Sequence, residues 1–422
     1  MIEHTSESDE NQLASTAHFA QARRNWVLIV LAAVAMVATL PGRTFGLGLI
    51  TEELLDSLQL DRLSYGLMNT WATLIGATFC LPCGWLVDRL GVRSTMTTVL
   101  IGLGLTVYTM SLLERQASGL ILLPTALFLL LLLTRGLGQS ALSVFSLTLM
   151  GQVAGKRGGI AVGCYSVLVS LGFMAAFGLS RYLLHDLNMS WREYWGRLGL
   201  VLIFVVAPAT YVLAPRPCQA KKEERSSDGT TGHSLVQALL SRPFWIFAGA
   251  TSLYGLISAG IALFNESILH ERGFPRVIFL NISIASPLVG LAGNLGAGLL
   301  AERVGLPRLL VLAMLFLALA LFGFPYVSTI SEIYLYAAVV GLVGGMITAI
   351  FFGVWVRLYG VRELGRIQGA AQMLTVLASA IGPLLFAYSF SIDASYLPLM
   401  RILAFVSLVF ALAACTLKNK GD

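Results

Sequence analysis

The chain has 422 residues, of which 57% are apolar and only 12% are charged, and its mean hydropathy is +0.80. Because soluble domains carry about 25% charged residues, this composition excludes a water-soluble globular domain, a disordered chain and a disulfide-stapled secreted scaffold. The net charge of +6 could indicate a nucleic-acid partner in a soluble protein, but here we expect none. We expect an all-α membrane protein whose main partner is the lipid bilayer.

Long apolar stretches predict twelve membrane-spanning helices. A spanning helix needs about 20 mainly apolar residues, whereas a β-barrel strand alternates over about ten. Runs such as 121–133 and 309–322 are continuous, which favours helices. The predicted spans are 25–50, 63–87, 95–113, 119–153, 158–185, 196–214, 243–269, 276–300, 308–327, 332–358, 366–389 and 396–417.

The distribution of lysine and arginine predicts the orientation. In the twelve-span arrangement, 18 of the 28 basic residues fall on the side that holds both termini, 8 on the other side and 2 inside spans. Basic residues concentrate in cytoplasmic loops. We therefore expect a multi-pass protein of the cytoplasmic (inner) membrane with both termini in the cytoplasm.

The longest polar interruption divides the spans six and six. It is rich in charged residues, Ser, Thr and Gly, which is typical of a linker between two compact units. The predicted organisation is a disordered cytoplasmic tail at 1–24, a six-helix bundle at 25–214, a cytoplasmic linker at 215–242, a second six-helix bundle at 243–417 and a cytoplasmic tail at 418–422.

A short repeat supports this division. The sequence GWLVDRLGVR at 84–93 follows the second span, and GLLAERVGLPR at 298–308 follows the eighth, 214 residues later. A glycine, an acid, an arginine and a second glycine recur in register. With its twelve spans, the chain resembles the major facilitator superfamily, whose members carry this motif in two pseudo-symmetric six-helix halves.

Three further stretches are similar to bacterial monocarboxylate and oxalate/formate-type porters. They are PGRT at 41–44, RGLGQ at 135–139 and GRIQG at 365–369. The resemblance implies a secondary transporter, a symporter or antiporter, that works as a functional monomer. Its two halves would rock about a central site so that a small solute meets each side of the membrane in turn.

The repeated motif is a candidate conformational latch. A carboxylate at Asp88 can accept hydrogen bonds from a helix N-terminus and can pair with Arg89 or Arg93. The resemblance implies that the partner helix is the eleventh span, near Gly365. Gly84 and Gly91 would permit close packing and a tight turn, while Glu302, Arg303 and Arg308 would form a weaker counterpart. The alternative is that these charges are solvated and act only as topology signals.

Two arginines fall deep inside predicted spans. A charge at the bilayer centre costs at least about 2.5 to 3.5 kcal/mol, so such residues are functional candidates. Arg135 lies near the middle of the fourth span and resembles a family arginine tied to proton coupling or substrate charge. Arg43 follows Pro41 and Gly42, where a break in the helix would form the wall of a site. The alternatives are a buried structural role for Arg135 and a position at the outer interface for Arg43.

Two such cations with no acid at mid-span favour an anionic solute, such as a carboxylate. The related carriers place basic residues in the C-terminal half, where the eighth and eleventh spans here offer neutral amides instead. Glu266 could carry a proton for H⁺-coupled transport, or could face water outside the membrane. The candidate substrate-binding residues are Arg43, Arg135, Gln139, Tyr165, Tyr254, Asn281 and Gln372.

Other function classes lack their motifs. There is no phosphate-binding loop of the G-x-x-x-x-G-K-[ST] type and no H-E-x-x-H or serine-elbow motif. We expect no catalytic residues, no cofactor and no metal site, and hence no enzyme. Two alternatives to anion transport stay open: efflux of drugs or neutral metabolites, and a sensor or membrane assembly protein that transports nothing.

Overall fold

A computed structural model describes residues 21, 23–60, 62–114, 122–154, 159–215 and 232–417. The predicted tails and linker lie mostly outside these residues. All regular secondary structure in the described ranges is helical, which confirms the all-α class. Helices suit a bilayer because they satisfy every backbone hydrogen bond internally.

The N-terminal half begins with the span Arg23–Gly42 and is interrupted several times. Its further elements are α2 (Thr44–Gly48), α3 (Thr51–Leu58), α4 (Arg62–Ala77), α5 (Cys80–Leu90), α6 (Val92–Ser111), α7 (Leu122–Leu133), the π-helix η2 (Thr134–Leu142), α8 (Ser143–Ala154), α9 (Gly159–Arg181), α10 (Trp191–Val201) and α11 (Ala207–Leu213).

The C-terminal half begins with the short α13 (Leu235–Leu239) and continues with longer helices. These are α14 (Arg242–Glu271), α15 (Arg276–Arg303), α16 (Leu306–Gly323), α17 (Ile330–Tyr359), α18 (Leu364–Asp393) and α19 (Leu397–Cys415). Side-chain caps mark several starts. Thr329 and Glu332, for example, form a reciprocal capping box at the start of α17.

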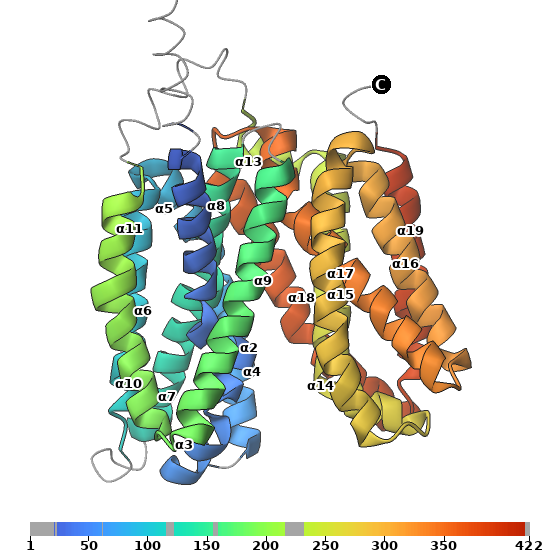
Figure 1. The fold of residues 1–422 in the computed structure, drawn as a ribbon, viewed down its shortest axis with the longest axis horizontal. Coiled ribbons are helices and arrows are strands. Elements are labelled where there is room, and N and C mark those ends of the chain that lie inside the picture. The colour runs from blue at the N-terminus through green and yellow to red at the C-terminus, as the bar shows by residue number, and fades with distance from the viewer. Residues whose placement is uncertain are drawn as a thin grey trace, which may run out of the picture.

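The two halves lie side by side, coloured blue to green and yellow to red in Figure 1. Within each half, pairs of helices approach closely through small residues. A Cβ atom on Gly345 of α17 would lie 2.0 Å from the carbonyl oxygen of Gly290 in α15, and one on Gly199 of α10 would lie 2.7 Å from that of Gly104 in α6. Such glycine contacts replace hydrophobic packing where the solvent is itself apolar.

One end of the molecule carries the end of α5 and the start of α18, and we call it the latch end. The first span begins there and α19 ends there, at the top of Figure 1. The hydrogen bonds between the halves among the described residues all lie close to this end. Besides those of Asp88, Thr148 Oγ1 in α8 donates to Gln368 Oε1 in α18 at 2.9 Å, and Gln368 Nε2 donates to the carbonyl of Leu147.

Ten of the described helices are long and apolar enough to cross a membrane. The two predicted spans without a counterpart among those ten correspond to α6 and α15, which are helices of 20 and 28 residues. Each packs along a neighbouring helix of its own half, α6 on α10 and α15 on α17. The multi-pass character is therefore confirmed, and the number twelve stays a prediction.

Candidate functional site

The first span is interrupted at Pro41 and Gly42. A short 3₁₀ turn covers Leu40–Gly42, Arg43 adopts an extended backbone, and α2 starts at Thr44. Proline fixes its own backbone angle and has no N–H to donate, so an α-helix does not run smoothly through it. The chain therefore breaks where the sequence analysis expected a break.

This break packs against the π-helix η2 of the fourth span. A Cβ atom on Gly42 would lie 2.5 Å from the carbonyl oxygen of Thr134 and 2.9 Å from the Cα of Gly138, so only glycine fits there. Irregular backbone at membrane depth is tolerated where protein buries it, and π-helical turns are frequent at functional sites. The two irregular segments form a single unit.

Arg135 joins the two segments from within η2. It is 1% exposed. Its Nη1 donates to the carbonyl of Gly42 at 3.0 Å and to Thr44 Oγ1 and Gln139 Oε1 at 3.1 Å each. Its Nε and Nη2 both donate to Asn69 Oδ1 of α4, at 3.1 and 2.7 Å. Every guanidinium nitrogen therefore has a partner, and all the partners are neutral groups of the N-terminal half.

Arg43 is held less completely. It is only partly buried. Its Nε donates to Thr39 Oγ1 at 2.7 Å, and its Nη2 lies 3.3 Å from Ser143 Oγ and 3.1 Å from Met36 Sδ. Its Nη1 has no hydrogen-bond partner among the described residues. Arg43 thus has a guanidinium nitrogen without a partner among the described residues, whereas each nitrogen of Arg135 has one.

Aromatic rings flank the Arg43 guanidinium. Its central carbon lies 5.2 Å from the ring centroid of Phe173 in α9 and 6.0 Å from that of Phe45 in α2. Phe45 also contacts Phe173 edge-on at 5.6 Å and Phe177 at 5.2 Å between ring centroids. A cation near ring faces is attracted by their quadrupoles. We call Arg43, Phe45, Phe173 and Phe177 the arginine–phenylalanine cluster.

Neither arginine is paired with a carboxylate of the described residues. The two cations are near enough to act on each other electrostatically. The electrostatic field of this region is therefore positive, which suits an anion. Each guanidinium nitrogen of Arg135 already donates to a protein group, whereas Nη1 of Arg43 has no such partner among the described residues.

The side chain of Asp88, near the end of α5, contacts the start of α18. Its Oδ1 accepts the backbone N–H of Gly365 and its Oδ2 that of Arg366, both at 2.9 Å. These are first-turn N–H groups that have no partner inside the helix, and the helix dipole favours a negative charge there. The carboxylate therefore joins the two halves at the latch end, on the helix that the resemblance implied.

Glycines allow this approach. A Cβ on Gly84 would lie 2.3 Å from the carbonyl oxygen of Gly365, and one on Gly369 would lie 2.5 Å from that of Cys80. Nearby, the ring of Tyr165 meets that of Phe352 edge-on at 5.0 Å. The latch end is thus closed by backbone contact as well as by charge.

The arginines of the first motif do not pair with Asp88 in the described structure. Arg89 lies over the ring of Trp85 at 5.1 Å, and Arg93 lies over that of Tyr211 at 4.2 Å. Adjacent residues on a helix project in different directions, so Arg89 does not point toward the start of α18 as Asp88 does. The cation that acts on Asp88 electrostatically is Arg366.

The second motif copy repeats the turn, and its acid acts on a cation of its own half. Gly91 and Gly305 have φ angles of 82° and 86°, a conformation that favours glycine. Glu302, in contrast, is exposed and acts electrostatically on Arg357, whose Nη1 lies 3.3 Å from the carbonyl oxygen of Ala301. Arg303 and Arg308 of this copy are also exposed.

The other predicted substrate residues are dispersed. Gln139 is part of the Arg135 network. Tyr165 is fully buried with its hydroxyl 2.8 Å from Ser146 Oγ, and it acts electrostatically on Arg43. In the C-terminal half, Gln372 is buried in α18, Asn281 is exposed on α15, and Tyr254 is partly buried on α14. None of these three has a hydrogen bond to Arg43 or Arg135 among the described residues. Glu266 lies in α14, and its side chain is outside what the structure describes.

Sequence reasoning missed several contributing residues. Asn69 accepts two hydrogen bonds from Arg135, and an amide in the otherwise apolar second span was a signal that could have found it. Thr39 and Ser143, which hold Arg43, are indistinguishable in the sequence from many other hydroxyl residues. Phe173 is brought to Arg43 only by the packing of α9 on the first span, where Gly172 meets Val37.

The sequence matches the profile of the Major Facilitator Superfamily over residues 27–383. The chain belongs to this superfamily. Solved structures agree: the human organic anion transporter MFSD10 (TETRAN) has a TM-score of 0.68 and 14% sequence identity, with 93% of this chain and 99% of that chain covered. The superfamily transporter FucP, in the outward conformation, has a TM-score of 0.65 and 15% identity, with 93% and 97% covered. A search of curated proteins gives no significant match.

At these identities the likeness shows a shared fold. This superfamily member is therefore a membrane transporter of the small-solute class and not an enzyme. The narrower resemblance to monocarboxylate and oxalate/formate-type porters stays a prediction.

Proposed function

We propose that this protein is a secondary transporter that moves a small organic anion by alternating access, with Arg43 as the residue that binds the anion. The observation that carries the proposal is the arrangement of Arg43. It is a cation directly after the candidate span Arg23–Gly42, it has no acidic partner among the described residues, and its Nη1 has no hydrogen-bond partner there. A carboxylate could accept a charge-assisted hydrogen bond from that nitrogen.

The arginine–phenylalanine cluster narrows the solute. Phe45 and Phe173 present rings beside the guanidinium, so a bound anion would rest against apolar surface. This favours a carboxylate attached to a compact apolar or aromatic body over a small inorganic ion. The similar structure of MFSD10 is that of an organic anion transporter, which is consistent with this class.

Arg135 has a different role in this proposal. It holds the broken first span against η2 through Gly42 and Thr44, and so fixes the backbone from which Arg43 projects. It also adds positive potential without touching the anion. Of the two arginines predicted to bind the substrate, the proposal therefore assigns direct contact with the anion to Arg43.

The closed latch end defines one of the two states that alternating access needs. With Asp88 bound to α18, the halves meet at this end, and the anion would enter from the opposite end. Rocking of the halves would break the Asp88 contacts and open the latch end, which we propose is cytoplasmic. Proton coupling is part of the proposal and is tested by the pH dependence of uptake.

The direct test is thermal unfolding of the purified protein with a panel of carboxylates, inorganic anions, cations and neutral metabolites. A ligand at 100 times its Kd stabilises by about 2.7 kcal/mol. We expect one class of organic carboxylates to stabilise the wild type but not Arg43→Gln. Arg197→Gln, which removes an exposed arginine of α10, is the matched control and should respond as the wild type does.

Two results would overturn the proposal. Stabilisation by neutral or cationic compounds alone would favour efflux of drugs or metabolites. An undiminished carboxylate response in Arg43→Gln would place the anion elsewhere.

A further inference from the structure

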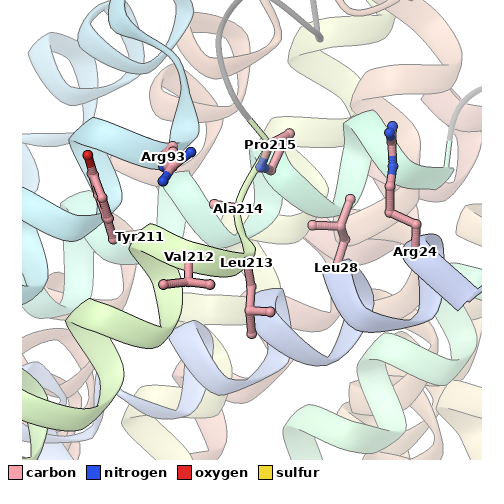
Figure 2. Close-up of a pocket in the computed structure, with 8 residues that line it drawn as sticks. All are labelled: Arg24, Leu28, Arg93, Tyr211, Val212, Leu213, Ala214 and Pro215. Carbon is pink, nitrogen blue, oxygen red and sulfur yellow. The ribbon is translucent and has the colours of Figure 1, made fainter.

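A pocket outside the proposed substrate site lies at the latch end of the N-terminal half. It has a volume of about 460 Å³ and is bounded by the start of the first span, the start of α6 and the end of α11. Figure 2 shows Arg24 and Arg93 on either side of Ala214 and Pro215, with Tyr211 and Val212 beside Arg93. We call it the basic pocket.

The basic pocket attracts negative charge. Two of its lining residues are arginines, and none of the lining residues in the described ranges is acidic. The Nε atom of Arg93 is buried and has no hydrogen-bond partner among the described residues. The guanidinium rests on the ring of Tyr211, at 4.2 Å from its centroid. A buried donor without an acceptor is costly, so an anion that supplied one would be held.

The helix that carries Arg93 adds to this field. Arg93 is the second residue of α6, whose N-terminal N–H groups receive no side-chain cap. The positive end of the helix dipole therefore adds to the charges of the two arginines. Phosphate is the anion that such a combination of arginines and a helix start recognises well.

The position of the pocket favours a phospholipid headgroup over free phosphate as the ligand. The candidate membrane spans Arg23–Gly42 and Trp191–Leu213 begin and end at its walls, which places it at the depth of lipid headgroups. Three of its lining residues at the end of α11, Tyr211, Val212 and Leu213, are 55%, 72% and 47% exposed, so they offer an apolar surface to lipid. A free phosphate would use only the polar part of this site, whereas a phospholipid would use both parts.

We propose that the basic pocket binds the phosphate headgroup of an anionic phospholipid, with its acyl chains against Tyr211, Val212 and Leu213. The phosphate lies between Arg24 and Arg93 and accepts hydrogen bonds from both. Basic pockets between membrane helices are suited to such headgroups, and each arginine near an anionic membrane surface contributes about 1 kcal/mol.

The experiment is native mass spectrometry of the full-length protein in detergent, titrated with phosphatidylglycerol and, separately, with phosphatidylcholine of the same acyl chains. We expect phosphatidylglycerol to bind more tightly, and Arg93→Gln or Arg24→Gln to weaken it about fivefold. Arg89→Gln removes an arginine of the same loop that does not line the pocket, so it should bind as the wild type does.

Several outcomes would overturn the proposal. Equal binding of the two lipids, or equal losses in Arg89→Gln and Arg93→Gln, would show general attraction to the protein surface. Competition by inorganic phosphate alone at the same concentration as the lipid would identify a soluble-anion site. The Arg24→Gln variant keeps the test decisive if Arg93→Gln fails to fold.

Discussion

The two copies of the glycine, acid and arginine motif share a backbone turn and differ in what their acids contact. Gly91 and Gly305 have nearly the same positive φ, so both loops turn alike. Asp88 receives two N–H groups of α18 across the boundary between the halves, whereas Glu302 stays exposed near Arg357. The comparison teaches that the repeat preserves the turn, while the two acids meet different groups: helix N–H groups of the other half for Asp88 and a cation of its own half for Glu302.

A similar division holds for Arg43 and Arg135. Both belong to the N-terminal half, and they have different contacts. Arg135 donates to neutral acceptors from every nitrogen and holds two irregular segments together, and Arg43 has one nitrogen without a partner beside aromatic rings. A fold with two similar halves therefore has one half that carries the proposed binding chemistry.

The largest expected effect separates the two arginines. Arg135→Ala leaves the buried Gly42 carbonyl and the partly buried amides of Asn69 and Gln139 without their donor, at about 1 to 3 kcal/mol for the carbonyl and less for each amide. We expect the free energy of unfolding to fall by about 3 kcal/mol or more. Arg43→Ala should cost about 1 kcal/mol, because its donors have fewer partners. Denaturant unfolding in detergent measures both, and equal losses would contradict the division.

A second prediction tests the two motif copies. Asp88→Asn removes the charge at the α18 N-terminus and leaves only one acceptor for two N–H groups. We expect the equilibrium to shift from the closed latch end by about 1 to 2 kcal/mol, or roughly five- to thirtyfold in population. Glu302→Gln should shift it by less than about 0.5 kcal/mol, as for other surface substitutions. Distances between spin labels on α5 and α18 report the shift, and equal shifts would refute the asymmetry.

A smaller effect concerns the start of α18, which Asp88 contacts. Glu363, the residue before that helix, accepts the N–H of Leu235 at the start of α13, and this hydrogen bond lowers the pKa of Glu363 below its ordinary value of 4.5. Because the folded-state pKa is lowered, the contact is fully present above 4.5 and is lost as the pH falls through the lowered value. Between pH 7 and 5 we expect no change.

Hydrogen exchange of residues 232–241 measures this contact. The protection from exchange, taken relative to the intrinsic rate at each pH, should fall only below pH 4.5 in the wild type and should be lower at every pH in Glu363→Gln. Ser234→Ala removes the capping box of α13 and should raise exchange without a pH dependence of its own. A loss of protection between pH 7 and 5 in the wild type would assign the contact to another group.

Much of the fold follows from the sequence because a bilayer restricts the choice. Continuous apolar runs in lipid form helices, so the all-α class and most spans were predictable. The Pro41-Gly42 break was predictable because proline carries its own backbone constraint. The contact of Asp88 with α18 rested on the repeated motif and on the family resemblance, since residues 277 apart are not linked by periodicity.

The candidate site was less predictable. The hydrogen bonding of Arg135 depends on a carbonyl that the break exposes and on an asparagine 66 residues away, and neither is visible in the fourth span. Arg89 and Arg93 were expected near Asp88 by proximity in sequence, but helix geometry turns them toward Trp85 and Tyr211. The Phe173 contact depends on how α9 packs, which composition does not determine.

The central claim is that Arg43 binds the transported anion, and countertransport in proteoliposomes tests it most directly. Vesicles loaded with the stabilising carboxylate should take up the labelled compound through the wild type and Arg197→Gln. Arg43→Gln should lose at least about tenfold of this exchange, while its folding and its latch-end distances stay unchanged. Wild-type exchange by Arg43→Gln, or exchange limited to uncharged analogues, would contradict the account.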